Sequence, residues 1–192
     1  SAFESFSTIG DDIPSYLPLY HLIVGNMARL LSISSFTAML IFSVISHLLA
    51  FLSIYLLARE ISDDNLIGTV TAAILVPLVA FPVFKYTNFT QIVLFHLFFY
   101  ILLRFSKNRT WTNAIVMGVL YGLNGLAHGS AFIGISLLMP FVFYYLFVGS
   151  FKWDKAISNI KGDLGGLYRF IASMAIGILL SLLYWLEPLL HL

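Results

Sequence analysis

The stretch that decides the fold is 36–58, FTAMLIFSVISHLLAFLSIYLLA. It runs for 23 residues without an Asp, Glu, Lys or Arg. A helix needs about 20 predominantly apolar residues to cross the hydrocarbon core of a bilayer. The stretch therefore predicts a transmembrane helix, and we interpret the rest of the chain around it.

Further apolar segments follow this stretch. Pro77 and Pro82 predict a kink or break in the first of them, and the second is short enough to be either a tilted span or a segment shielded by neighbouring protein. We interpret 149–167 as a polar connection with a flexible glycine turn. The pattern predicts an all-α integral membrane protein in which 1–192 form one membrane domain. Its six transmembrane spans are predicted at 36–58, 66–84, 92–103, 111–127, 131–148 and 168–186.

The N-terminal 32 residues differ from the rest. Apolar residues recur at helical spacing through 18–32, with His21, Asn26 and Arg29 between them. This pattern predicts an amphipathic helix lying in the membrane interface. Residues 1–16 are polar and aromatic and contain no Lys or Arg, so they lack the basic start of a signal peptide. We interpret them as a loop outside the hydrocarbon.

The composition supports a membrane class. Hydrophobic residues make up 60% of the chain and charged residues 10%, whereas soluble domains carry roughly 25% charged residues. A net charge of +1 argues against nucleic acid as a partner, because proteins that bind it usually carry a basic stripe. The chain has no cysteine, which excludes disulfides, a thiol nucleophile and thiolate metal ligands.

Orientation follows from the distribution of basic residues. Eight of the ten Lys and Arg lie in the alternate connections that begin at Arg59, Arg104 and Lys152, and the other two are Arg29 and Lys85. Cytoplasmic loops carry the excess of basic residues. We therefore expect a multi-pass protein of the cell membrane, or of the endoplasmic reticulum in a eukaryote, with its N-terminal segment outside the cytoplasm. The outer side would then hold Asp11, Asp12, the 85–91 loop, the His128 turn and Glu187.

The acidic pair is the candidate for chemistry. Asp11 or Asp12 at a water–lipid boundary could take a proton from an acceptor hydroxyl. The pair could also hold a divalent cation, Mg²⁺ or Mn²⁺, that clamps a phosphate leaving group. The structural alternative is a solvated loop that caps the following helix.

Three basic or titratable side chains are candidate substrate-binding residues. His21, Lys85 and His128 could each contact a phosphate, and the glycines around His128 permit close approach of a ligand. The alternatives are snorkelling to water for His21 and a tight helix turn for His128. His47 and His96 lie within predicted spans, where a titratable side chain could have a function. Because the sequence pattern supplies no carboxylate partner, we expect structural roles for both, as hydrogen bonds between helices.

The order of these features resembles the membrane module of GT-C-type glycosyltransferases, in particular the dolichyl-phosphate-mannose protein mannosyltransferase-like proteins and their archaeal relatives. Asp11, Asp12 and YLPLYH at 16–21 are similar to the family's first outer loop. GLNGLAHGSAF at 122–132 is similar to its Gly-Leu-Ala turn with a histidine, and YWLEP at 184–188 to the ends of its late helices.

The resemblance implies transfer of a sugar from a polyprenyl-phosphate donor on the non-cytoplasmic face. Asp11 or Asp12 would be the base or metal-bridging acid, and Lys85 and His128 would face the lipid phosphate. The partners would be the lipid-linked sugar donor, membrane lipids and other membrane subunits. Because the family module begins with a helix ahead of the acidic loop, we expect the chain to be part of a longer protein. The alternative is a non-enzymatic structural or accessory membrane subunit, or a transporter component.

Overall fold

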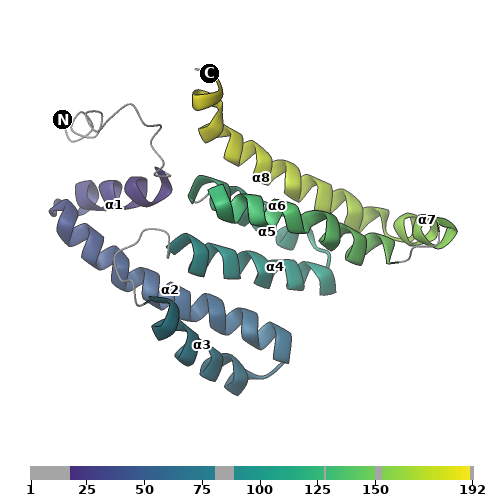
Figure 1. The fold of residues 1–192 in the computed structure, drawn as a ribbon, viewed down its shortest axis with the longest axis horizontal. Helices are drawn as coiled ribbons and strands as arrows, with labels where there is room; N and C mark the ends of the chain where they lie inside the picture. The colour runs from purple at the N-terminus through teal and green to yellow at the C-terminus, as the bar shows by residue number, and fades with distance from the viewer. Residues whose placement is uncertain (1–17, 81–88, 128, 150–152, 191–192) are drawn as a thin grey trace.

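A computed structural model describes residues 18–80, 89–127, 129–149 and 153–190 (Figure 1). Every regular element in these ranges is a helix, which confirms the all-α prediction. Two helical segments, Ser35–Ser62 and Leu164–Leu182, are long and apolar enough to cross a membrane. The longest apolar stretch of the sequence thus lies in one candidate span.

Consecutive long helices run in alternating directions, so their ends gather at two ends of the molecule (Figure 1). The beginnings of α2, α4 and α6 lie at one end, which we call the α1 end. The ends of α2, α4 and η3 lie at the other, the α7 end. The elements are α1 (Pro18–Leu31), α2 (Ser35–Ser62), α3 (Asn65–Ala80), the π-helical η2 (Phe89–Leu94), α4 (Phe95–Lys107), α5 (Trp111–Ala127), α6 (Gly129–Phe143), the π-helical η3 (Tyr144–Val148), α7 (Trp153–Gly162) and α8 (Leu164–Leu190).

Local chemistry sets the ends of α2. The Ser34 hydroxyl accepts a hydrogen bond from the Thr37 amide at 3.1 Å, which satisfies one of the free N–H groups of the first turn. At the other end Asp63 adopts a left-handed conformation with φ 56°, and its amide donates to the Arg59 carbonyl at 2.8 Å. The helix therefore continues beyond Ala58, where the uncharged stretch ends.

The predicted polar connection at 149–167 is helical over much of its length. It contains α7, which buries Ala156 and packs Ile160 against the main core. The glycines predicted to form a flexible turn are also helical, because α8 begins at Leu164. The Asp163 carboxylate accepts a hydrogen bond from the Gly166 amide at 3.0 Å and so caps the first turn of α8.

Two other predictions are corrected in length. The segment predicted at 92–103 is extended on both sides, since η2 begins at Phe89 and α4 ends at Lys107. The helix α3 continues through Pro77 to Ala80, and Pro82 lies outside the described residues.

The main core is built on a close contact between α5 and α8. A Cβ atom added to Gly118 would lie 2.5 Å from the Ser173 carbonyl oxygen, and one added to Gly122 would lie 2.6 Å from the Leu180 Cβ. Small residues at such positions let two helix backbones approach directly, as in membrane helix pairs. Around this contact pack Leu94, Phe98, Phe105, Met117, Tyr121, Ile135, Phe147 and Phe170.

A smaller cluster joins α2 and α3 to η2. It is formed by Ala50, Ile54, Ala72, Ile92 and Val93. The buried Ser53 hydroxyl lies 2.9 Å from the Ala50 carbonyl oxygen and 3.2 Å from that of Ile92, so it bridges the two helices. This cluster fixes α2 beside the start of α4.

Candidate functional site

The helix α1 lies across the α1 end and packs on the first turns of α2 (Figure 1). Val24 of α1 is buried against Ala38 and Phe42 of α2. The Tyr20 ring meets the Phe42 ring edge to face at 5.5 Å between centroids, and burial raises the pKa of the Tyr20 hydroxyl. One face of this amphipathic helix is therefore held against the bundle.

His21 is the one predicted site residue whose side chain the structure describes. It is exposed on α1, and its ring meets the Tyr20 ring edge to face at 5.4 Å between centroids. The imidazole can therefore contact molecules that surround α1. Its predicted contact with a phosphate stays a prediction.

The other predicted site residues, Asp11, Asp12, Lys85 and His128, lie outside the described residues. His128 is bracketed by the end of α5 and the start of α6, and both lie at the α1 end (Figure 1). Leu19 of α1 also packs against the core cluster that contains residues of α5. Within the described ranges, no three His, Asp or Glu side chains form a group that could hold a metal ion.

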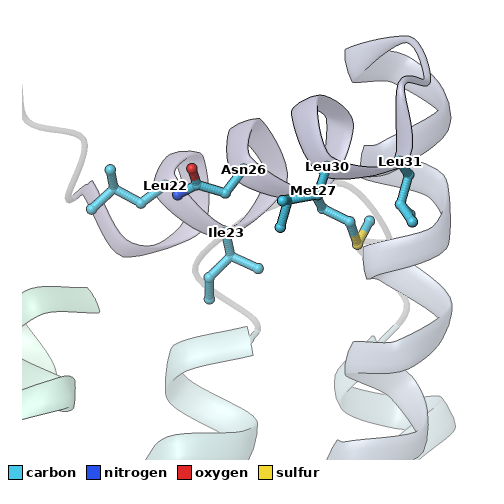
Figure 2. A pocket seen from close by; sticks show the side chains of 6 residues that line it. All are labelled: Leu22, Ile23, Asn26, Met27, Leu30 and Leu31. Atoms are coloured by element: carbon cyan, nitrogen blue, oxygen red, sulfur yellow. The ribbon is translucent and has the colours of Figure 1, made fainter.

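An apolar groove runs along α1, and the sequence analysis did not predict it. Its volume is about 470 Å³, and Asn26 is the polar residue in its lining. Leu30 is 84% exposed and Leu22 49% exposed, so this face of α1 is not covered by the described chain. The lining residues are Leu22, Ile23, Asn26, Met27, Leu30 and Leu31 (Figure 2).

Arg29 is exposed in the last turn of α1 and is not one of the residues that line this groove. At 100° per residue it lies about 20° from Leu22 around the helix axis, on the flank opposite the side that packs on α2. An arginine side chain can extend its charge several ångströms from its backbone while its stem follows an apolar surface.

Asn124 is a buried polar residue of α5 that the sequence analysis did not single out. Its side chain is fully buried, and its amide nitrogen donates to the Leu120 carbonyl oxygen at 2.8 Å. Among the described residues its carbonyl oxygen Oδ1 has no hydrogen-bond partner. The signal available in the sequence was an amide side chain in the apolar, glycine-rich second half of this helix.

The two histidines predicted to hydrogen-bond between helices bond instead to the carbonyl four residues earlier. His47 Nδ1 lies 2.7 Å from the Ser43 carbonyl oxygen, and His96 Nδ1 lies 2.5 Å from the Ile92 carbonyl oxygen. Each ring therefore donates to the carbonyl one turn earlier in its own helix.

A polar cluster centred on Arg109 lies at the α7 end. Arg109 forms an ion pair with Asp163, donates to the Leu146 carbonyl oxygen at 2.9 Å and stacks 4.8 Å from the centroid of the Phe147 ring. Arg169 donates to the Arg109 carbonyl oxygen at 2.6 Å. Burial lowers the pKa of Arg109, but a guanidinium remains protonated at neutral pH. These contacts join the α4–α5 turn, η3 and the start of α8.

Comparison of the chain with family models, curated proteins and solved structures finds no match.

Proposed function

We propose that this chain is the membrane module of a GT-C-type glycosyltransferase that moves a sugar from a polyprenyl-phosphate donor to an acceptor outside the cytoplasm. In this proposal the six predicted segments all span the membrane, and the α1 end faces the non-cytoplasmic side. The observation that carries the proposal is the sequence from Asp11 to His21. It combines an acidic pair with an aromatic, proline-containing stretch and leads directly into an interfacial helix.

Two features of the described residues support this assignment. The amphipathic α1 packs across the bundle at the same end as the junction of α5 and α6, where His128 lies in the sequence. The connections rich in basic residues share the opposite end, where Lys107 pairs with Glu60 at 2.9 Å and Arg109 pairs with Asp163. This segregation of charge is what the positive-inside rule requires of a protein oriented with α1 outside.

The proposed reaction is a displacement at the anomeric carbon of the sugar. The acceptor hydroxyl oxygen forms a bond to that carbon, the bond from carbon to the lipid phosphate oxygen breaks, and Asp11 or Asp12 accepts the hydroxyl proton. His21, Lys85 and His128 stabilise the charge of the leaving phosphate. Most of the catalysis comes from positioning and charge stabilisation. A Mg²⁺ or Mn²⁺ ion held by Asp11 and Asp12 would neutralise part of the phosphate charge.

Single substitutions of the acidic pair test the proposal. The full chain is expressed in membranes and supplied with polyprenyl-phosphate donors carrying labelled mannose, glucose or N-acetylglucosamine. We expect Asp11→Asn or Asp12→Asn to lower transfer at least a hundredfold with unchanged membrane insertion. Asp154→Asn, on the exposed side of α7, is the matched control and should transfer normally. No transfer by the unsubstituted chain with any donor, or equal transfer by all variants, would leave the non-enzymatic subunit as the better assignment.

A further inference from the structure

We infer that the α7 end binds the headgroup of an anionic phospholipid and that Arg169 is the residue that holds its phosphate. The inference concerns the end of the molecule away from α1 (Figure 1), so it does not depend on the proposed sugar transfer. It depends on the start of α8 lying in a membrane, and Leu164–Leu182 is long and apolar enough to cross one.

Arg169 carries a positive charge that the described residues do not balance. The nearby carboxylate of Asp163 pairs with Arg109, and Arg169 forms no ion pair in the described part of the chain. Its Nη1 donates to the Arg109 carbonyl oxygen at 2.6 Å, and its buried Nε has no hydrogen-bond partner within the described ranges. A charge removed from bulk water is costly unless an opposite charge compensates it. An anion from the surroundings of α8 would supply that compensation.

The position of Arg169 matches the depth of a lipid phosphate. It lies five residues after Leu164, about 7.5 Å along the axis of α8, inside the candidate span. Its guanidinium carbon lies 5.7 Å from the centroid of the Trp111 ring, and Trp111 is 52% exposed. The exposed Tyr168 precedes it. Because Trp and Tyr concentrate at the level of lipid headgroups, these rings indicate that the guanidinium lies at that level.

The apolar side chains beyond Arg169 and Trp111 favour a lipid over a free anion. Ile176 follows Arg169 by two turns of α8 and lies about 20° from it around the axis. Ile115 follows Trp111 by one turn of α5, about 40° around the axis, and is exposed. An acyl chain attached to a phosphate at Arg169 could run over these side chains, whereas a soluble anion would make no use of them.

The charge around Arg169 favours a headgroup with a net negative charge. The α4–α5 turn, α7 and the start of α8 together hold four cations and two carboxylates among their described residues. The cations are Lys155, Lys161, Arg109 and Arg169, and the carboxylates are Asp154 and Asp163. On the predicted orientation this end lies at the cytoplasmic leaflet, where anionic lipids attract basic segments. A zwitterionic headgroup would bring a further cation into this region.

Quenching of Trp111 fluorescence by brominated lipids tests the inference, because bromine quenches a tryptophan that it contacts. In the full chain with Trp153→Phe and Trp185→Phe, Trp111 is the only tryptophan. This protein is purified in neutral detergent and titrated with phosphatidylglycerol or phosphatidylcholine that carry the same brominated acyl chains. A charged hydrogen bond corresponds to a factor of about ten or more in affinity. We therefore expect phosphatidylglycerol to bind at least about tenfold more tightly, and millimolar inorganic phosphate not to displace it.

Substitutions then identify the residue that provides this selectivity. Arg169→Gln should reduce the affinity for phosphatidylglycerol to that for phosphatidylcholine. Arg169→Lys keeps the charge but loses the planar fork that binds phosphate, and should give an intermediate affinity. The matched control is Arg104→Gln. Arg104 lies at the same end, 5.9 Å from the centroid of the Tyr100 ring, but is exposed, so its loss should leave the affinity unchanged.

Three results would overturn the inference. Equal quenching by the two lipids would show an unselective contact with the bilayer. Displacement of phosphatidylglycerol by inorganic phosphate would show a site for a soluble anion. Equal losses in Arg169→Gln and Arg104→Gln would show that the overall charge of this end, rather than a site at Arg169, attracts the lipid. The first two comparisons keep Arg169 in place, so they decide the matter even where Arg169→Gln does not fold.

Discussion

Arg109 in the α4–α5 turn forms an ion pair with Asp163, 54 residues later in the chain, and Asp163 also caps the first turn of α8. One carboxylate thus fixes the start of a long helix and ties it to the turn that precedes α5. The two helices that follow these residues form the close pair at the centre of the molecule. The ion pair therefore fixes the first turns of α5 and α8 relative to each other.

Removing this ion pair should destabilise the protein. Arg109→Ala loses the pair, the hydrogen bond to Leu146 and the contact with the Phe147 ring. Hydrogen bonds to charged groups contribute about 1.5–3 kcal/mol each, so we expect a loss of at least about 2 kcal/mol in the free energy of unfolding. Thermal unfolding in detergent measures it as a lowered Tm. The matched control is Lys107→Ala, since Lys107 is 60% exposed in its pair with Glu60 and exposed pairs contribute about 0–1 kcal/mol. Equal effects of the two variants would show that the Arg109 cluster has no special role.

Adding a methyl group to the α5–α8 contact should also destabilise the fold. In Gly118→Ala the new Cβ meets a backbone carbonyl of α8, which cannot move away as a side chain would. Overpacking of this kind costs about 1–3 kcal/mol. Gly134→Ala in α6 is the control, because a Cβ there meets nothing within 4 Å, and alanine is favoured over glycine in a helix by about 0.5–1 kcal/mol. Opposite shifts in Tm are expected, and a stabilised Gly118→Ala would contradict the described packing.

Asn124 should tolerate replacement by leucine. Its buried carbonyl oxygen has no hydrogen-bond partner in the described part of the chain, and the hydrogen bond from its amide nitrogen to the Leu120 carbonyl oxygen lies within α5. Replacing such a group with an apolar one of similar shape is nearly neutral or stabilising, so Asn124→Leu should change the free energy of unfolding by less than about 1 kcal/mol or increase it. Ser53→Ala should instead lose about 1 kcal/mol, because that hydroxyl bridges α2 and η2. A large destabilisation by Asn124→Leu would mean that Oδ1 has a partner in the membrane.

The orientation of the protein can be measured with introduced cysteines, since the natural chain has none. A cysteine at Ser7 should react with an impermeant maleimide added from the non-cytoplasmic side. A cysteine at Ser158, exposed on α7, should react only after the membrane is opened. The reverse pattern would place the acidic pair in the cytoplasm and rule out the proposed reaction.

The sequence predicts the helices better than it predicts the site. Strong periodicity or a long uncharged stretch identified α1 and α2, and α5 was predicted with the bounds that the structure gives. The short, polar α7 was missed because its helical pattern depends on one buried alanine and one isoleucine whose partners lie elsewhere in the chain.

The candidate site depends on contacts between elements, which local patterns do not contain. The groove arises because Val24 and Tyr20 face α2 while Leu22 and Leu30 are left exposed. Whether the side-chain oxygen of Asn124 finds a hydrogen-bond partner depends on how the neighbouring helices pack around it. Of the predicted site residues only His21 falls among those whose side chains the structure describes.

The glycine contact between α5 and α8 determines where this molecule can change shape. At Gly118 the backbones of the two helices lie directly against each other, and the side chains of Tyr121, Ile176 and Leu180 pack around the glycines of this contact. A change in the angle between α5 and α8 would therefore require their backbones to separate at Gly118. We expect these two helices to move as one unit in any change of shape.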